Sequence, residues 1–596
     1  MANSPLNDST GVLSFLITCD GQSMPDLVKV VSIETRHSFN RIPSATITIL
    51  DGDMPNGHFP VADAGNFKPG TKIVISAGYD SKTQVIFEGI VIKHAVKING
   101  ENYSRLIIEC RDKALAMTVG RKNASYVNKT DNQIISTLIS NHADLSATVD
   151  STSVTYKELV QYYVTDWDYM MARAEVNGLL VNVDAGKVSV AAPATSGSPV
   201  LTLTYGADLQ EFQAELDSCW QLSSVTSTSW DLAKLAIVQQ TAQPEKLTGQ
   251  GDLDSKTLAT VLNAGDFGLQ TAAPLESDAL TAWSKAQQTK AALSRIRGRM
   301  QFQGSALAKP GVLLELKGVG KHFNGNVIAS NVIHSISDGN WVTEVEFGMP
   351  TYWFTEEHQI QAPEAAAWTA GISGLHIGIV LKLDADPEGQ YKIQVSIPLM
   401  NAATVGVWAR FSSFYGSSGF GAFIIPEIGD EVILGFFNND PSCPVILGSL
   451  YSSKHVPPYE LAAENNFKAI VTRSKLKLEF DEEKKIITLI TPGKNKVVIS
   501  DEDKSILLQD QNNNKVELSP SGILLDSPKD ITINAKGKVA ISAVQNVEIT
   551  AQMDVKTTGL NINSTANVSF VAKGTASAEL SAAGQTTVKG AMVMIN

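Results

Sequence analysis

The sequence predicts a multidomain, mainly β protein. It would have an α+β hub with β-barrel domains, a five-stranded OB-fold neck, and a C-terminal needle in which three chains form one intertwined β-helix. Three observations predict this: short alternating apolar runs through the first ~120 residues, a barrel-sized β unit at residues 374–451, and a fixed apolar period from Leu476 onward. At 596 residues the chain is long enough for several domains.

The C-terminal period is the strongest of these observations. From Asp530 a pair of large apolar residues recurs every eight residues, and Ala535, Ala543 and Ala551 follow the first three pairs in register. The phase shifts near Gly559 and then resumes, and from Leu476 to Leu525 a similar alternation repeats every ten residues or so. The predicted core residues of the needle are Ile531, Ile533, Val539, Ile541, Val547, Ile549 and Val555.

The size of each repeat predicts how many chains build the needle. One block offers two large inward side chains, each worth about 2 kcal/mol when buried, whereas ordering the backbone costs roughly 1–2 kcal/mol per residue. Three chains wound together would close a thin core and leave no lateral sheet edge. The repeat therefore favours an intertwined homotrimer, with a single-chain β-solenoid or a fibrous adhesin stalk as the alternatives.

Composition excludes several classes of function. The net charge of −13 argues against a nucleic-acid or anionic-membrane partner bound by general electrostatics. Four cysteines (Cys19, Cys110, Cys219, Cys443) lie far apart without a CxxC pair, which predicts buried reduced thiols and neither a metal site nor a disulfide framework. Residues 1–11 lack the layout of a signal peptide, and no apolar run approaches ~20 residues. We therefore expect a cytosolic chain that leaves the cell, if at all, outside the general secretion route.

The first 365 residues predict an N-terminal domain of β-barrels with helical insertions. Alternating runs between Val12 and Thr118 favour antiparallel barrel strands. Asp166 is placed to cap the second of the predicted helices, and Gly178 suits the residue after its end. The predicted helices are Asn132–His142, Asp166–Gly178 and Glu276–Arg297, and further strands are Leu179–Val183, Gly311–Lys317 and Asn326–Ser337.

A linker at Gln359–Gly371 separates this hub from the neck at residues 372–455, and the needle follows at residues 470–596. The neck has the size of an OB-type barrel. Its predicted strands are Leu375–Leu383, Tyr391–Ser396, Gly406–Phe411, Gly421–Ile425 and Glu431–Phe436.

The neck also carries the densest family resemblance. Its motifs are Asp386-Pro387-Glu388-Gly389, Val407-Trp408-Ala409-Arg410, Gly419-Phe420-Gly421-Ala422-Phe423, Pro426-Glu427-Ile428-Gly429-Asp430-Glu431-Val432, and Pro444-Val445-Ile446-Leu447-Gly448-Ser449-Leu450-Tyr451. In this order they resemble VgrG, the spike of type VI secretion systems, and the equivalent spikes of contractile injection particles and phage tails. Weaker matches in the hub begin at Thr165 and at Lys309.

The resemblance implies a homotrimer in which the hub adapts a sixfold, Hcp-like inner tube to a threefold spike and contacts baseplate proteins. It also implies a PAAR-like tip protein on the needle and effectors as further partners. Assembly would take place in the bacterial cytoplasm within a contractile particle, with release on firing or lysis and contact with the target membrane only on firing.

The last residues of the chain predict where a tip protein binds. Met592, Val593, Met594 and Ile595 are apolar and Asn596 closes the run, so three copies would present a small apolar platform. Methionine suits a surface that must fit an asymmetric partner, because its side chain is flexible. The alternative is that these residues only finish the last strand.

The sequence predicts no catalytic, cofactor or metal site. Asp166 and Asp168 lie at a helix start, where carboxylates favour the helix dipole, and Gly416–Gly421 lies between strands as a turn. The resemblance implies that Glu388 and Glu427 are structural, whereas the sequence alone leaves a hydrolase site there open; we interpret His334 and His376 as satisfied histidines. Residues 452–475 are too few for an enzyme domain. A spike with cell-wall hydrolase activity and a trimeric tail fibre or adhesin are the competing functions.

Overall fold

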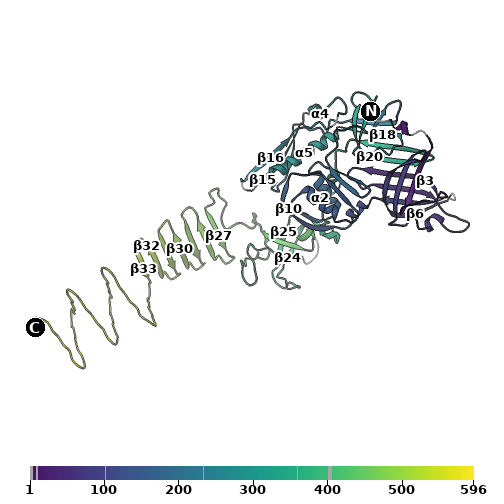
Figure 1. Cartoon of the computed structure of the whole chain (residues 1–596). Helices are drawn as coiled ribbons and strands as arrows, with labels where there is room; N and C mark the ends of the chain where they lie inside the picture. Colours follow the sequence, from purple (N-terminus) through teal and green to yellow (C-terminus); the bar gives the residue numbers. More distant parts are fainter. Residues whose placement is uncertain are drawn as a thin grey trace. The chain divides into compact units, whose positions relative to one another are not determined.

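The computed structural model describes residues 4–8, 11–100, 103–232, 234–247, 249–358, 360–400 and 406–595 (Figure 1). It divides into two compact units, Met1–Leu450 and Tyr451–Asn596. The predicted mainly β class is confirmed, since 39% of the structure is strand and 12% is helix.

A 13-stranded sheet organises the first 350 residues or so of the first unit. Its order is β14-β18-β21-β20-β3-β4-β7-β6-β5-β1-β2, and β19 joins β20 while β13 pairs in parallel with β19. The strands are β1 (Leu13–Cys19), β2 (Gln22–Ser23), β3 (Lys29–Ser38), β4 (Ser44–Leu50), β5 (Lys72–Tyr79), β6 (Lys82–Asn99), β7 (Tyr103–Arg111), β13 (Leu201–Thr204), β14 (Leu209–Leu216), β18 (Ile296–Gln303), β19 (Leu313–Lys317), β20 (Gly325–Ser337) and β21 (Asn340–Phe347).

Two apolar cores lie against this sheet. One gathers the inward residues of β1 and β3–β7, such as Ile47 and Phe87. The other gathers those of β13 and β18–β21, such as Met300 and Phe347. The pairing of β20 with β3, in which Val332 lies opposite His37, joins the two halves. The alternating runs predicted as barrel strands are therefore strands whose alternation places one side in a core, but they belong to one open sheet rather than to a closed barrel.

An α/β segment between β7 and β13 packs around a third core. The two helices predicted in this segment, Asn132–His142 and Asp166–Gly178, are confirmed to within three residues at each end. Gly178 takes the left-handed conformation expected after a helix, at φ +68°. The N-cap prediction was wrong: Thr165, not Asp166, caps the second helix by accepting from the Asp168 amide. The elements are η2 (Lys113–Thr118), β8 (Lys122–Thr130), α2 (Asp131–Ser140), β9 (Ser146–Val149), β10 (Thr155–Val164), α3 (Asp166–Glu175), β11 (Leu180–Asp184) and β12 (Lys187–Ala191).

The segment before β18 is a three-stranded sheet covered by a helix. The predicted helix Glu276–Arg297 is α5 (Ser277–Leu293), which ends earlier because Ile296 and Met300 alternate into the core as β18. Helix α4 (Ser255–Leu262) was not predicted. The other elements are β15 (Ser224–Asp231), β16 (Ala236–Ala242), β17 (Asp266–Gln270), and elsewhere η1 (Pro5–Asp8), α1 (Pro60–Asp63), α6 (Phe354–Glu357) and η3 (Glu364–Ala367). No helix in the described part of the chain is long and apolar enough to cross a bilayer.

The predicted neck is a closed five-stranded barrel with the order β22-β23-β24-β26-β25. The prediction of a strand at Gly421–Ile425 was wrong, because only an isolated bridge between Gly416 and Gly421 forms there. The fifth strand is β26, whose Ile446 fills the core. The elements are β22 (His376–Lys382), β23 (Ile393–Ser396), η4 (Pro398–Met400), β24 (Val407–Phe411), β25 (Glu431–Phe436), η5 (Phe437–Asn439) and β26 (Pro444–Ser449).

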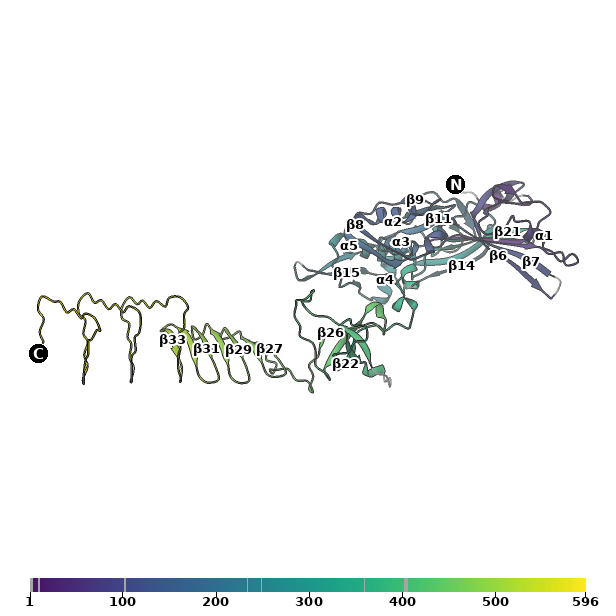
Figure 2. The ribbon, with the colours of Figure 1, turned by 90° about the horizontal axis from the view of Figure 1, so that it is seen from below.

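The second unit begins as a seven-stranded meander, in which each strand pairs antiparallel with the next (Figure 2). Its strands are β27 (Phe467–Val471), β28 (Lys477–Asp481), β29 (Ile486–Ile490), β30 (Lys496–Ser500), β31 (Ser505–Gln509), β32 (Lys515–Ser519) and β33 (Gly522–Asp526). After Asp526 the described residues 527–595 contain no helix or strand and run as an extended zigzag.

Candidate functional site

One face of the needle meander is built from two rows of large apolar residues. Within each row the residues of neighbouring strands lie directly opposite one another. Positions two apart on a strand point to the same side, so both rows share one face. The rows are Leu478, Leu489, Val497, Leu508, Val516 and Leu525, and Phe480, Ile487, Ile499, Ile506, Leu518 and Ile523.

No described residue of the second unit covers this apolar face. Leu489 is 51% exposed and Leu525 is 56% exposed, and the first row lines an open groove of about 950 Å³. The opposite face is more polar: Lys477 Nζ lies 2.7 Å from Glu479 Oε2, and Lys515 and Glu517 repeat the pair at 3.5 Å. The meander is therefore an amphipathic sheet whose apolar side is open.

The seven residues predicted as needle core continue this pattern without any sheet around them. Their exposure ranges from 55% at Val547 to 75% at Ile541, and no strand pairing involves described residues after Asp526. In this extended segment the apolar side chains lie in water and the backbone groups have no sheet partners. Burial and hydrogen bonding therefore contribute little free energy to offset the conformational entropy lost on ordering the segment. Within the second unit, the described residues offer residues 527–595 no sheet partner that would offset this cost.

The predicted tip platform is equally open. Met592, Met594 and Ile595 are at least 80% exposed, and Val593 is half exposed. Asn596 lies outside the described residues. The structure thus leaves these side chains available to a partner.

The strands of the meander recur about every ten residues, as predicted, but sequence reasoning missed that the turns repeat over pairs of strands, every 19 residues. Lys475, Lys494 and Asn513 occupy equivalent turn positions with φ between +65° and +69°. Asn495 Oδ1 accepts from the Gln511 amide at 3.0 Å, which links two neighbouring turns. The spacing of Asn495 and Asn514, each followed by Lys and Val, is the signal that would have revealed it.

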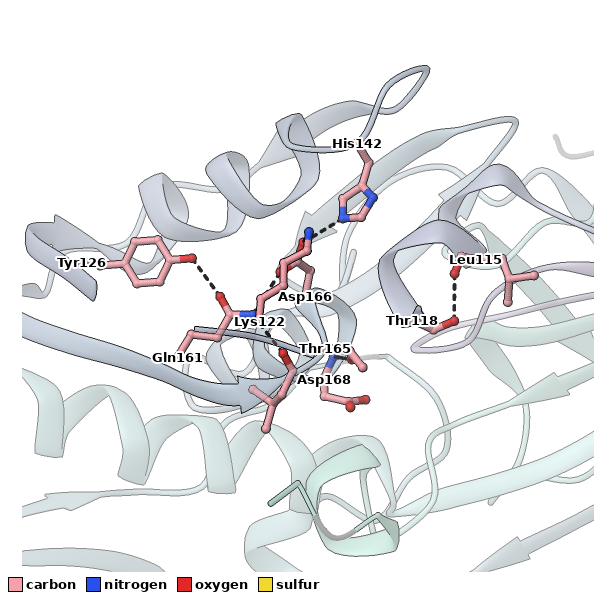
Figure 3. Close-up of polar contacts among 10 residues, drawn as sticks. Leu115, Thr118, Lys122, Tyr126, His142, Gln161, Thr165, Asp166 and Asp168 are labelled. Atoms are coloured by element: carbon pink, nitrogen blue, oxygen red, sulfur yellow. Dashed lines mark hydrogen bonds and ion pairs between the residues drawn. The ribbon is translucent and has the colours of Figure 1, made fainter. Parts of the chain in front are cut away.

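The Asp166/Asp168 pair of the hub is a structural feature (Figure 3). Asp166 is buried, with Lys122 Nζ at 2.5 Å and His142 Nε2 at 2.7 Å from Oδ2, and Gln161 Nε2 donates to Oδ1 at 3.0 Å. Burial opposes ionisation, but these hydrogen bonds outweigh it and hold the pKa of the Asp166 carboxyl below its ordinary value. Asp168 is not part of this cluster, so the two carboxylates do not form a catalytic pair.

A second buried carboxylate, Asp131, also joins α2 to α3. We call the two contacts, Asp131 with Arg173 and Asp166 with His142, the clasp. Asp131 begins α2 and accepts from Arg173 Nε at 2.6 Å and Nη2 at 2.9 Å, near the end of α3. Asp166 begins α3 and contacts His142, just past the end of α2. Each carboxylate therefore lies at a positive helix end and is paired with a residue from the opposite end of the other helix. The clasp fixes the two helices together.

The pKa of Asp166 predicts a specific loss of stability in acid. Because its folded pKa is depressed, its contribution is complete above about pH 4, the ordinary value for Asp, and is lost as pH falls through the folded pKa. The melting temperature of Asp166→Asn should therefore approach that of the wild type as pH falls below about 4. Calorimetry from pH 3 to 7, with Asp168→Asn as the control, checks this; a gap that does not change with pH would contradict it.

The remaining candidate residues also have structural surroundings. His334 is buried with Nδ1 at 3.0 Å from Thr343 Oγ1, and burial lowers its pKa to about 3. His376 Nε2 lies 3.1 Å from the Ser373 carbonyl. In the barrel turns, Glu388 pairs with Lys392 at 2.8 Å, and the Glu427 amide donates to Asp430.

The thiol prediction was half wrong. Burial raises the pKa of Cys19 to about 11 and that of Cys110 to about 12, whereas Cys219 and Cys443 are exposed because they lie in loops at the surface. All four are unpaired. The described residues hold no group of three or more His, Cys, Asp or Glu side chains that suits a metal ion.

Two family models match this chain. Residues 376–451 match the model described as the type VI secretion system/phage-baseplate injector OB domain. Residues 9–338, more than half of the chain, match the model described as the Alg8 N-terminal domain, a description that names no activity.

Curated relatives match a short part of the chain. The type VI secretion system spike protein VgrG5 of Pseudomonas aeruginosa is 35% identical over 81 residues, which is 13% of this chain and 10% of the relative. VgrG1a of the same organism is 37% identical over 67 residues, 11% of this chain and 10% of the relative. The actin cross-linking toxin VgrG1 of Vibrio cholerae is 44% identical over 54 residues, 9% and 5% of the two chains. The match thus spans a tenth or less of each relative.

Among solved structures, proteins of phage tails and secretion machinery match this chain with TM-scores below 0.5. The 43 kDa tail protein of prophage MuSo2 from Shewanella oneidensis has a TM-score of 0.44 at 11% identity, covering 57% of this chain and 99% of that one. The E. coli c3393 protein, a component of the type VI secretion system, has a TM-score of 0.38 at 14% identity, covering 73% and 99%.

Proposed function

We propose that this chain, which belongs to the family of the Alg8 N-terminal domain and resembles the VgrG spikes over its barrel, is the homotrimeric hub and spike of a contractile injection particle. Residues 1–365 form the hub that adapts a sixfold, Hcp-like inner tube to the threefold spike and nucleates the baseplate. Residues 372–455 are the neck, and residues 470–596 are the needle that punctures the target envelope. The particle assembles in the bacterial cytoplasm and carries effectors as further partners.

The observation that carries the trimer is the open apolar side of the needle. Nine of the twelve row residues are 38–75% exposed, and Leu478, Val497 and Val516 are partly buried, so covering the face adds a little less than about 1 kcal/mol per residue, or roughly 10 kcal/mol per chain. Association costs roughly 4–15 kcal/mol, so the meander alone is near balance. Residues 527–595 contribute the additional favourable free energy of association, because their apolar side chains and backbone groups gain partners only from the other copies. Three copies close this core without leaving a sheet edge.

The mass of the native protein tests this proposal. Native mass spectrometry of the purified full chain should show a species of three copies of the 63.9-kDa chain. A species of one copy at micromolar concentration would contradict the proposed trimer.

We also propose that one PAAR-like tip protein binds the platform formed by three copies of residues 592–596. Deleting residues 591–596 should leave the trimer intact, since the rest of the needle remains, and should remove co-purification of the tip protein. The matched control replaces Thr586 and Thr587 with Ser, upstream of the platform. Full retention of the tip protein by the truncated spike would place its binding site elsewhere.

The spike is proposed to have no catalytic turnover of its own. The runner-up, a spike that hydrolyses the cell wall, requires an acid/base pair, and the barrel carboxylates Glu388 and Glu427 are the best candidates for one. Purified protein should leave a peptidoglycan suspension turbid at the rate of the buffer. Clearance by the wild type that is lost in Glu388→Gln or Glu427→Gln would favour the hydrolase.

A further inference from the structure

A loop of the neck barrel displays large apolar side chains that the barrel itself does not use. We call residues 413–428, between β24 and β25, the aromatic loop. Phe414 is 88% exposed and Phe423 is 87% exposed. The other large apolar residues of the loop that are at least half exposed are Tyr415, Phe420, Ile424 and Ile428. The barrel core is already filled by residues such as Val380, Val395 and Leu434, each fully buried.

The aromatic loop is ordered by its own hydrogen bonds. The Ala422 amide donates to the Tyr415 carbonyl at 2.8 Å, and the Ser417 amide donates to the Phe420 carbonyl at 2.9 Å. Gly421 has φ +141°, and a Cβ there would lie 2.6 Å from the Tyr415 carbonyl oxygen, so only glycine fits this close approach. Ile425 packs against the barrel core and anchors the loop. The aromatic side chains are thus held outward by a built turn rather than left on a loose strand.

The exposed surface has the size of a subunit interface. Six side chains of this kind, each about 55–90% exposed, present roughly 800 Å² of mainly apolar surface. Monomers rarely expose apolar patches beyond a few hundred Å², and a standard interface buries about 800 Å² per partner. The loop carries one charged residue, Glu427, so like charges do not oppose contact between copies.

The short connection between the barrel and the needle indicates which molecule the aromatic loop contacts. Strand β26 ends at Ser449 and β27 begins at Phe467, so the intervening residues reach at most about 60 Å. If the needles of three copies form one intertwined structure, the short connections hold the three barrels close together. The effective concentration of one barrel near another is then on the order of millimolar, as for other short tethers. We propose that the aromatic loop of each copy packs against the barrel of a second copy, so that the neck is a subunit interface in addition to the needle. This inference rests on the proposed trimer.

Hydroxyl-radical footprinting of the purified full chain, read out by mass spectrometry, tests this interface. Phe414 and Phe423 should be modified about tenfold less in the trimer than in the isolated monomer fraction of the Ile541→Asp/Ile549→Asp protein, which lacks the needle interface, because a side chain buried at an interface core loses nearly all its exposure. Tyr391, which is 95% exposed on another turn of the same barrel, should be modified equally in both. The purified chain contains no tube or baseplate protein, so protection must come from another copy.

A loop variant separates this inference from the trimer itself. Phe414→Ser/Phe423→Ser should keep the native mass of a trimer through its needle, while Tyr415 and Phe420 become modified several-fold faster than in the wild-type trimer. A wild-type trimer in which Phe414 and Phe423 are modified as fast as Tyr391 would overturn the neck interface and leave the trimer standing. A wild type of single-chain mass would overturn both.

Discussion

Replacing Ile541 and Ile549 with Asp is expected to convert the trimeric spike into monomers and aggregates. Both side chains are more than 70% exposed in the single chain, so neither charge disturbs contacts within it. In the trimer each substitution places three carboxylates in a thin apolar core, and an unpaired charge buried there costs several kcal/mol. The total is of the same size as the association energy, so the needle should not assemble.

Light scattering and limited proteolysis measure this effect. The matched control is Ser542→Asp/Thr550→Asp, which adds the same charge at the next residues, where alternation turns the side chains to the outer face. The control should stay trimeric and protease-resistant. An Ile541→Asp/Ile549→Asp protein that also stayed trimeric and resistant would show that these residues are not in a shared core.

Replacing Asp131 with Ala is expected to destabilise the hub by about 3–5 kcal/mol, because it leaves the buried Arg173 cation without its partner. Asp131 is fully buried and the Arg173 side chain is 16% exposed, so solvent screens this pair weakly. The loss should appear in urea unfolding of the hub as a lower midpoint. It should not change the mass of the trimer, since the needle is unaffected.

Two further variants identify the cause of the loss of stability in Asp131→Ala. Asp131→Ala/Arg173→Met should recover much of the stability, because replacing both members of a buried ion pair removes the uncompensated charge. Asp168→Ala, in the first turn of α3 outside the clasp, should cost less than about 1 kcal/mol. A double variant no more stable than Asp131→Ala alone would mean that lost packing, rather than the stranded charge, causes the effect.

Much of this fold could be predicted from periodicity and capping residues. Alternating runs located the hub and barrel strands, because burial of one sheet face dictates a period of two. Helix α4 escaped prediction because it is short and its signals, Asp254 as N-cap and left-handed Asn263, are local. The fifth barrel strand was misplaced because Gly421–Ile425 and Pro444–Ser449 are both short apolar runs, and only tertiary pairing with β24 and β25 selects the second.

The apolar rows of the needle could be predicted, but not which repeats pair within one chain. Up to Asp526 each 19-residue repeat contains turn residues that accept a left-handed backbone, such as Lys494 and Asn513, so neighbouring strands fold back on each other. The eight-residue blocks after Asp530 leave few residues for such a turn beside a strand. The period of the apolar residues shows only that one face of the sheet is apolar. The residues available for turns determine whether the neighbouring strands come from the same chain or from other chains.

Backbone hydrogen exchange of the native full-length protein tests the central claim most directly. If two other copies supply the partners that residues 531–593 lack, the amides of these residues should exchange as slowly as those of strands β28–β32, which pair within the chain. Exchange of residues 531–593 at the rate of an unstructured peptide, in a sample whose mass is that of one 63.9-kDa chain, would contradict the intertwined trimeric needle.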